Sequence, residues 1–412
     1  MKLFAHAHAT HPDWRIALSL AAAQIDAQRQ DASGTHVSEA TLGWVYFSDH
    51  FSSQATALLA ELNRRWPGVS WVGGAGVGVA ANGVEYMDEP ALALMLSDLP
   101  PDQFRVFSGM RPLGGADTFA CRTAQVHSDP SASDLPELIG EMSTRTATGY
   151  LFGGLASGRD GQALHIADGV FQGGLSGVAF GPGVRLVSRV TQGCQPVGPA
   201  RRVSQSLRNV VGWLDGEPAL DSLLLDLDID EDELRESLSR LRETLVGLSD
   251  DRDDLLSRPG TFGTDTRVRH LIGIDLQNRA LAIADTVEDG MQLAFCTRNL
   301  EAARRDLVRI CSEIREELEP DALPLEAALA LQGSEAERAP HPARRIAGAV
   351  YVSCAGRGGP HFGAPSAEME LVRHALGDVP LVGFFAAGEI AHRHLYTYTG
   401  VLTVFTSADG AA

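Results

Sequence analysis

One short segment, Cys-Ala-Gly-Arg-Gly, combines residue types that could do chemistry. Cys354 carries a thiol, and Arg357 offers a forked donor suited to a carboxylate. Gly356 and Gly358 would let a ligand approach the backbone closely. The segment follows Ala349–Ser353, an apolar run typical of a buried strand, and ligands of open α/β sheets bind outside the carboxyl ends of strands. We therefore expect a ligand contact here; the alternative is a turn whose arginine pairs with a structural carboxylate.

A second segment follows the next apolar run, residues 379–382. Gly383 ends this predicted strand, and Gly388 and Glu389 come shortly after it. A carboxylate beside an arginine could grip the ammonium group of an amino acid while Arg357 holds the ligand's carboxylate. Glu389 and Arg357 could also pair with each other. The two hypotheses differ in exposure, because a ligand site leaves both groups facing a cavity.

Catalysis by the Cys354 thiol would need an orienting base, and the sequence places no histidine beside it. We therefore predict a binding protein without catalytic residues and not an enzyme. His6, His8 and His11, like the pair that begins at His392, have spacings that permit two metal ligands but fix no third. Neither a metal nor a cofactor is expected.

Composition narrows the classes of protein further. The 412 residues are 44% hydrophobic and 21% charged, as in globular proteins, and the formal net charge is −19. Such an acidic surface repels phosphate backbones and anionic lipids, so neither nucleic acid nor membrane is an expected partner. Lys2 is the only lysine. Each of three protein classes needs a lysine in its active site: P-loop NTPases, lysine-linked pyridoxal enzymes and ordinary protein kinases. With no lysine beyond residue 2, the chain cannot belong to any of them.

The five cysteines are widely spaced and form no Cys-x-x-Cys motif, which disfavours a disulfide framework. No apolar run approaches the roughly 20 residues that span a bilayer. The first residues lack the basic and apolar regions of a secretory signal. We expect a cytoplasmic protein.

The elements that position these residues follow a strand–helix–strand plan. Leu42–Phe47 is a predicted strand, Ser52–Trp66 a predicted helix with apolar residues on one face, and Val69–Val72 another strand. This order within about 30 residues predicts parallel pairing with a right-handed crossover. The same plan returns near the C-terminus as Ala349–Ser353, Ser366–Leu376 and Val379–Val382.

Glycines mark equivalent positions in these copies. An offset of 310 residues aligns Gly73 with Gly383 and Gly78 with Gly388, and an offset of 80 aligns Gly73 with Gly153. Each copy reads as an apolar strand, a glycine, and a later apolar strand. We interpret the pattern as an internal duplication.

The region between the end copies differs. Leucines at helical spacing predict helices over Glu231–Leu248 and Arg298–Leu318, with strands at Val268–Ile274 and Ala280–Ala284. Gln332–Arg344 is a predicted surface loop. The predicted fold is a mixed-sheet, two-domain α/β protein with duplicated strand–helix–strand–glycine units, helices covering the sheets, and domains at residues 1–215 and 216–412.

Several motifs resemble one known family, FIST, named for F-box and intracellular signal transduction proteins. The runs Val170–Phe180, Thr191–Gly198 and Leu214–Ala219 resemble the FIST N-terminal domain and its exit. Ser353–Gly358 and Pro380–Ile390 resemble the C-terminal domain. The likeness covers nearly the whole chain in the expected order.

The resemblance implies a sensory module that binds a small ligand such as an amino acid. In bacteria such domains are often fused to signalling output domains, but here the two halves use the available length. A signal would therefore leave through a separate partner protein. The competing hypotheses are a protein-binding scaffold that uses no small ligand, and a thiol-dependent enzyme.

Overall fold

The computed structural model describes residues 3–29, 39–115, 117–159, 161–233, 236–250, 266–318 and 346–406. It confirms an α/β protein with several mixed sheets and helices. The chain forms two compact units. The larger consists of Met1–Val190, Leu307–Leu395 and Thr399–Ala412, and the smaller of Thr191–Asp306 and Tyr396–Tyr398. The smaller unit is thus inserted in the chain of the larger one.

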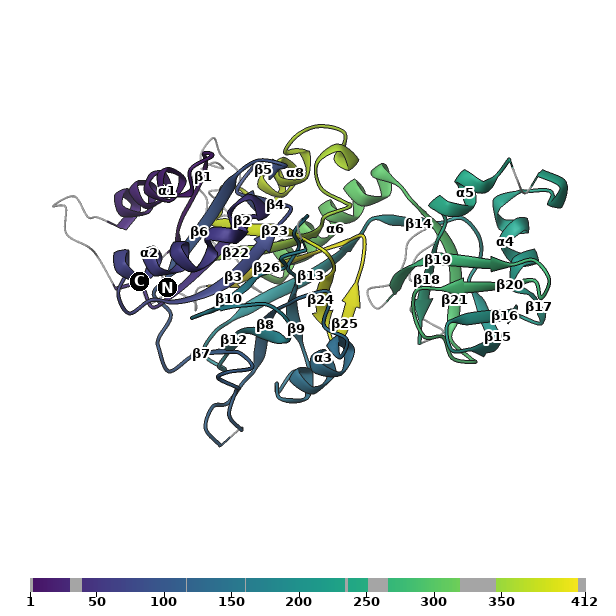
Figure 1. Cartoon of the computed structure of the whole chain (residues 1–412), viewed down its shortest axis with the longest axis horizontal. Helices are drawn as coiled ribbons and strands as arrows, with labels where there is room; N and C mark the ends of the chain where they lie inside the picture. Colours follow the sequence, from purple (N-terminus) through teal and green to yellow (C-terminus); the bar gives the residue numbers. More distant parts are fainter. Residues whose placement is uncertain are drawn as a thin grey trace, which may run out of the picture. The chain divides into compact units, whose positions relative to one another are not determined.

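The larger unit is built from three copies of one plan: strand, helix, strand, hairpin and return strand (Figure 1). The first copy comprises β2 (Leu42–Ser48), α2 (Ala55–Arg65), β3 (Ser70–Gly76), β4 (Gly78–Ala81), β5 (Val84–Met87) and β6 (Ala91–Ser97). The second comprises β8 (Thr123–Ser128), α3 (Leu135–Thr144), β9 (Leu151–Leu155), β10 (His165–Ala167), β11 (Val170–Phe171) and β12 (Leu175–Phe180). The third comprises β22 (Ile346–Cys354), α8 (Ala367–Leu376), β23 (Leu381–Ala386), β24 (Glu389–His392), β25 (His394–Tyr396) and β26 (Thr399–Thr406).

The three copies exchange their hairpins in a cycle. Each keeps its return strand, first strand and second strand together in one sheet, while its hairpin joins the sheet of another copy. The three sheet orders are β1-β6-β2-β3-β10-β11, β7-β12-β8-β9-β24-β25 and β13-β26-β22-β23-β4-β5. The edge strands are β1 (Ala5–Thr10), β7 (Phe104–Phe107) and β13 (Leu186–Gln192). The exchange therefore places β4–β5 of the first copy beside β23 of the third.

The predicted glycine repeat is confirmed by strand register. In each copy the first two strands pair in parallel, and one glycine of the second lies opposite the same point of the first. A Cβ at Gly73, Gly153 or Gly383 would lie 1.9, 1.9 or 1.8 Å from a backbone carbonyl oxygen of that first strand. Those oxygens belong to Val45, Val126 and Tyr351. Close strand approach, and not ligand access, requires glycine at these positions.

Helices cover the outer faces of the sheets, as predicted. Val45 and Phe47 of β2 pack under Leu58 and Leu62 of α2 in one apolar cluster, which α1 (Trp14–Arg29) extends. The opposite strand faces carry a buried interior, in which the Tyr46 ring stacks on Phe384 with centroids 4.9 Å apart.

The smaller unit holds a sheet in the order β14-β21-β15-β16-β20-β19-β18, with β17 paired to β16. Its elements are β14 (Cys194–Pro196), β15 (Arg201–Leu207), β16 (Val210–Leu214), β17 (Glu217–Pro218), α4 (Ala219–Leu227), α5 (Leu238–Glu243), β18 (Leu245–Ser249), β19 (Arg267–Asp275), β20 (Ala280–Ile283) and β21 (Gln292–Arg298). The long α6 (Leu300–Leu318) follows, close to its predicted range.

The predicted helix over Glu231–Leu248 is wrong. Its described residues form a short 3₁₀ turn at Glu231–Glu233 and α5, and the chain then continues as strand β18. β18 pairs with both β19 and β21, so its backbone hydrogen bonds are made across the sheet. A short apolar run is ambiguous between helix and strand until its partners are known. The predicted loop at Gln332–Arg344 lies outside the described residues.

Among the helices of the described residues, none combines the length and the hydropathy needed to cross a membrane.

Candidate ligand-binding site

The exchanged hairpin brings the Glu85 side chain of β5 to the first turn of α8. Its Oε1 accepts hydrogen bonds from the backbone N–H groups of Glu368 at 2.9 Å and Met369 at 3.2 Å, and its Oε2 from that of Gly359 at 3.0 Å. The first N–H groups of a helix have no partner within the helix and favour a negative charge. Glu85 thus caps a helix that lies more than 280 residues away in the chain.

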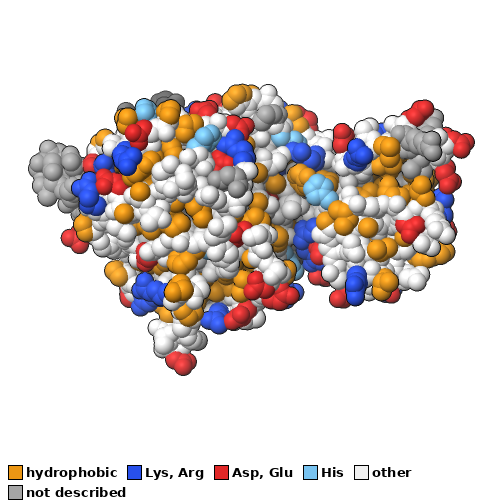
Figure 2. Space-filling model, viewed as in Figure 1, with side chains coloured by type: hydrophobic (Ala, Val, Ile, Leu, Met, Phe, Trp, Pro, Cys, Tyr) orange, Lys and Arg blue, Asp and Glu red, His pale blue; other side chains and the backbone are white. Residues whose placement is uncertain are grey.

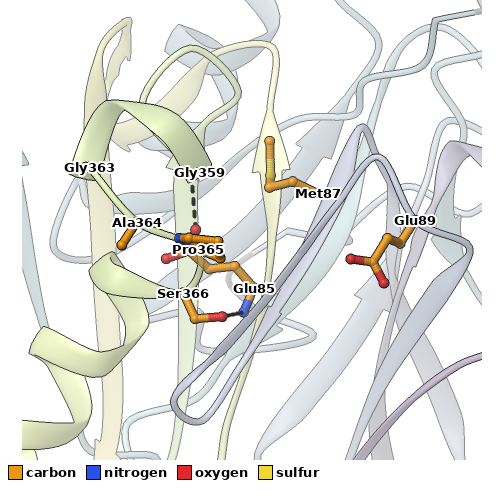
Figure 3. A pocket seen from close by; sticks show the side chains of 8 residues that line it. All are labelled: Glu85, Met87, Glu89, Gly359, Gly363, Ala364, Pro365 and Ser366. Carbon is orange, nitrogen blue, oxygen red and sulfur yellow. Dashed lines mark hydrogen bonds between the residues drawn. The ribbon is translucent and has the colours of Figure 1, made fainter.

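A cavity of about 410 Å³ opens at this junction (Figure 3). The backbone N–H of Glu85 donates to Ser366 Oγ at 3.0 Å, which ties the hairpin to the loop before α8. Eight of the residues that the structure describes line the cavity: Glu85, Met87, Glu89, Gly359, Gly363, Ala364, Pro365 and Ser366. Its volume is that of pockets that hold small metabolites.

Behind this wall, between β22 and α8, lies a buried polar network centred on Glu368. Its Oε1 accepts hydrogen bonds from the Tyr351 hydroxyl and from Arg357 Nε, both at 2.6 Å. Its Oε2 accepts one from Ser353 Oγ at 3.0 Å. The Arg357 and Glu368 side chains are 1% and 0% exposed. The arginine of the predicted site therefore pairs with a structural carboxylate, the alternative named for it above.

Glu389 belongs to the same buried neighbourhood. Its Oε2 accepts hydrogen bonds from the Thr399 hydroxyl at 2.7 Å and from the Thr399 backbone N–H at 3.1 Å. The Arg357 guanidinium and the Cys354 thiol both lie near enough to favour its ionised form. The structure thus brings Cys354, Arg357 and Glu389 together, but none of the three lines the described cavity.

The predicted glycines divide in the same way. Gly358 and Gly388 are buried, and the Gly388 carbonyl accepts a hydrogen bond from the backbone N–H of Leu155 at 2.8 Å. Gly383 serves the strand contact described above. Gly356 is the exposed member of the set, in the turn after β22.

Three carboxylates, those of Glu85, Glu368 and Glu389, are buried here, and the Arg357 guanidinium pairs with Glu368 and lies near Glu389. Burial raises the pKa of Glu85 to about 7, and repulsion by Glu368 adds to it, while the three backbone N–H groups oppose the rise. Burial likewise raises the pKa of Glu389 to about 8, against the lowering effects of Thr399, Arg357 and Cys354. Carboxyl groups whose pKa is raised this far above the ordinary value are common at functional sites, and they also occur in structural ion-pair networks.

The sequence hypotheses missed two central residues, Glu85 and Glu368. A signal for Glu368 exists, because the offset of 310 residues places it where the first copy has Leu58, on the buried face of the helix. For Glu85 no local signal exists, since its partners come from a different copy of the repeat.

The metal hypotheses find no support among the described residues, which contain no group of three or more His, Cys, Asp or Glu placed to hold an ion. His8 Nδ1 lies 2.7 Å from the Tyr86 hydroxyl and belongs to a side-chain pair.

Comparison with known proteins identifies both halves of the chain. The FIST N domain matches residues 41–217 and the FIST C domain residues 219–392. A Mycobacterium tuberculosis protein, described only as uncharacterised, is 29% identical over 422 residues, which cover 96% of this chain and 97% of the relative. An uncharacterised Mycobacterium bovis protein is 29% identical over 424 residues, with the same coverage. The chain therefore belongs to the FIST family, whose domains are regarded as sensory modules of signal transduction.

Proposed function

We propose that this FIST protein is a sensory module that binds a small ligand in the cavity between the β4–β5 hairpin and the loop before α8. The cavity is the observation that carries the proposal. Its walls come from two copies of the repeat, joined through Glu85 and Ser366. A ligand bound there would contact both, and so would favour one relative position of hairpin and helix.

The buried network gives such binding a route to the rest of the larger unit. Glu85 holds the first turn of α8, and that turn carries Glu368, which in turn holds Arg357. Arg357 influences Glu389 on β24, a strand of another sheet. In this proposal the predicted residues Cys354, Arg357 and Glu389 transmit the bound state and do not touch the ligand.

Binding without catalysis is the function that the site supports best. The Cys354 thiol is buried beside the Glu389 carboxylate and does not belong to the described lining of the cavity. A catalytic nucleophile has to reach the substrate that it attacks. All five cysteines are free thiols, which favours a reducing compartment.

Partners follow from the same reasoning. In this proposal the two FIST domains pass the bound state on to a separate signalling protein. On the face shown in Figure 2, acidic and basic side chains of the described residues are interspersed, and no continuous basic stripe suited to nucleic acid is seen.

A thermal-shift screen with a broad metabolite panel tests the proposal. A ligand at 100 times its Kd should add about 2.7 kcal/mol of stability. Ala364→Phe fills the cavity, whereas Ala60→Phe changes an exposed alanine of α2 and is the matched control. We expect stabilisation of the wild type and Ala60→Phe but not of Ala364→Phe. Equal stabilisation of all three proteins, or of none, would contradict the proposal.

A protein-binding scaffold is the second candidate, and exposed apolar side chains in the smaller unit favour it. Leu207, Trp213 and Ile272 are 76%, 42% and 59% exposed on strands of one sheet. The scaffold hypothesis predicts that Trp213→Ser weakens a partner complex while Ala364→Phe leaves it unchanged.

A further inference from the structure

The charges around the cavity point to the chemical class of its ligand. Glu85 and Glu89 supply the only ionisable side chains among the eight described lining residues. Met87, Ala364 and Pro365 contribute apolar surface, and Ser366 a hydroxyl. Figure 3 shows Glu85 and Glu89 on opposite sides of Met87. Among these described lining residues, a ligand meets two acids and no base.

The Glu85 carboxylate retains capacity for one more donor. A carboxylate offers about four acceptor positions. Oε1 already accepts two N–H groups, while Oε2 accepts only that of Gly359, itself a lining residue. The remaining position on Oε2 suits the N–H of an ammonium group, and a charge-assisted hydrogen bond of this kind is stronger than a neutral one.

The arginine that would hold a ligand's carboxylate is elsewhere. Arg357 is buried against Glu368 and is absent from the described lining. A free amino acid would therefore bring its own carboxylate close to Glu85 and Glu89 without a cation to balance it. The two lining carboxylates would repel the ligand's carboxylate, so the site disfavours free amino acids.

Resting on the proposed function, we infer that the cavity binds the protonated amino group of a small organic amine with an apolar body and no carboxylate. Glu85 accepts a hydrogen bond from the ammonium, Glu89 adds long-range attraction, and Met87 with Pro365 contacts the apolar part. The ammonium group supplies a positive charge that balances the two lining carboxylates.

A pH effect should accompany this binding. Glu85 faces Glu368 from α8, Glu89 follows on its own segment, and Arg373 of α8 contacts the hairpin turn at Gly83. Because the pKa of Glu85 is about 7, its carboxylate is mostly neutral at pH 6 and mostly ionised at pH 8. Affinity for an ammonium should therefore rise by about tenfold between these values.

The test uses three matched probes on the full chain: phenethylamine, phenylalanine and 3-phenylpropionate, compared by calorimetric titration and thermal shift. We expect the amine to bind at least about tenfold more tightly than the amino acid, and the acid not to bind. Binding of the acid or the amino acid in preference to the amine would overturn this inference and leave the ligand-binding proposal standing. If none of the three probes binds, this inference fails, and the proposed function fails as well only if the metabolite panel described above also gives no stabilisation.

Variants locate the interaction. Glu85→Gln should abolish most amine binding and its pH dependence, but it also weakens the helix cap. Glu89→Gln leaves that cap intact and should weaken the amine two- to fivefold. Asp88→Asn, which removes an equal charge from an exposed residue outside the described lining, is the control and should change affinity by less than twofold. Unchanged amine affinity in Glu85→Gln and Glu89→Gln would overturn the inference.

Discussion

Two copies of the same plan fill the space between helix and sheet with opposite chemistry. Beneath α2, the facing residues are Val45 and Phe47 of β2 and Leu58 of α2, all apolar. Beneath α8, the equivalent strand residues are Tyr351, which pairs with Gly383 as Val45 pairs with Gly73, and Ser353, two positions further along β22 as Phe47 is along β2. Here the helix presents Glu368. The same strand–helix–strand backbone thus accommodates either apolar or charged side chains between its helix and its sheet.

The comparison shows that the fold itself does not require the buried charges. An apolar filling avoids the desolvation cost of burying a carboxylate and a guanidinium, which often exceeds the gain from their attraction. The copy that carries the charges is also the copy whose helix is capped by Glu85 and bounds the cavity. We therefore connect the network with ligand sensing and not with stability.

The largest expected effect comes from breaking the ion pair. Arg357→Met removes the guanidinium and leaves the Glu368 carboxylate buried with only the Tyr351 and Ser353 hydroxyls. We expect a loss of about 3–5 kcal/mol in the free energy of unfolding, measured by urea denaturation, because an unpaired buried charge is left behind.

Converting the copy to apolar chemistry is the control. Arg357→Met combined with Glu368→Leu removes both charges, leaves only the neutral Tyr351 and Ser353 hydroxyls without their acceptor, and should recover at least half of that loss. Losses that simply add in the double variant would show that the charges are required for stability, against this account.

Glycine replacements test what the copies share. Gly73→Ala and Gly383→Ala each place a Cβ within 2 Å of a backbone carbonyl oxygen, at 1.9 and 1.8 Å. Each should lower the free energy of unfolding by about 3 kcal/mol, since backbone must move. Gly109→Ala, whose Cβ would have no heavy atom within 4 Å, should change it by less than about 0.5 kcal/mol. A clear difference between the first two variants would contradict their structural equivalence.

A smaller effect is expected from pH. Because the pKa of Glu389 is raised from 4.5 to about 8, the folded state binds a proton more tightly than the unfolded chain. Its contribution to stability is complete below pH 4.5 and is lost as the pH rises through 8. We expect wild type to lose on the order of 2 kcal/mol from this residue between pH 6 and 8.

Glu389→Gln should remove that part of the pH dependence in denaturation at pH 6 and 8. Glu370→Gln, an exposed acid on α8, is the control and should keep the wild-type difference. An unchanged difference in Glu389→Gln would contradict the proposed ionisation of this residue.

Local sequence patterns predicted the parallel strand pairs and the repeat, because the glycines that allow close strand approach recur at constant offsets. They did not predict the exchange of hairpins, which is decided by contacts such as Val382 with Ala81, about 300 residues apart. They failed at β18 for the same reason, since its partners come from distant segments.

The site was predicted only in part. Residue types at a strand end indicated Arg357 and Glu389 correctly as neighbours in one cluster, but not that both are buried. Exposure depends on what packs against a residue, and here the packing elements are α8 and the hairpin of another copy. Glu85 reaches the first turn of α8 only through that exchange.

Hydrogen exchange of the full chain with and without phenethylamine tests the central claim most directly. The account predicts slower amide exchange in residues 84–89 and 359–369 on binding, because the ligand joins hairpin and helix, and no change in residues 55–65 of α2. Saturating amine that leaves residues 359–369 unchanged, or slows α2 equally, would contradict a ligand site between Glu85 and α8.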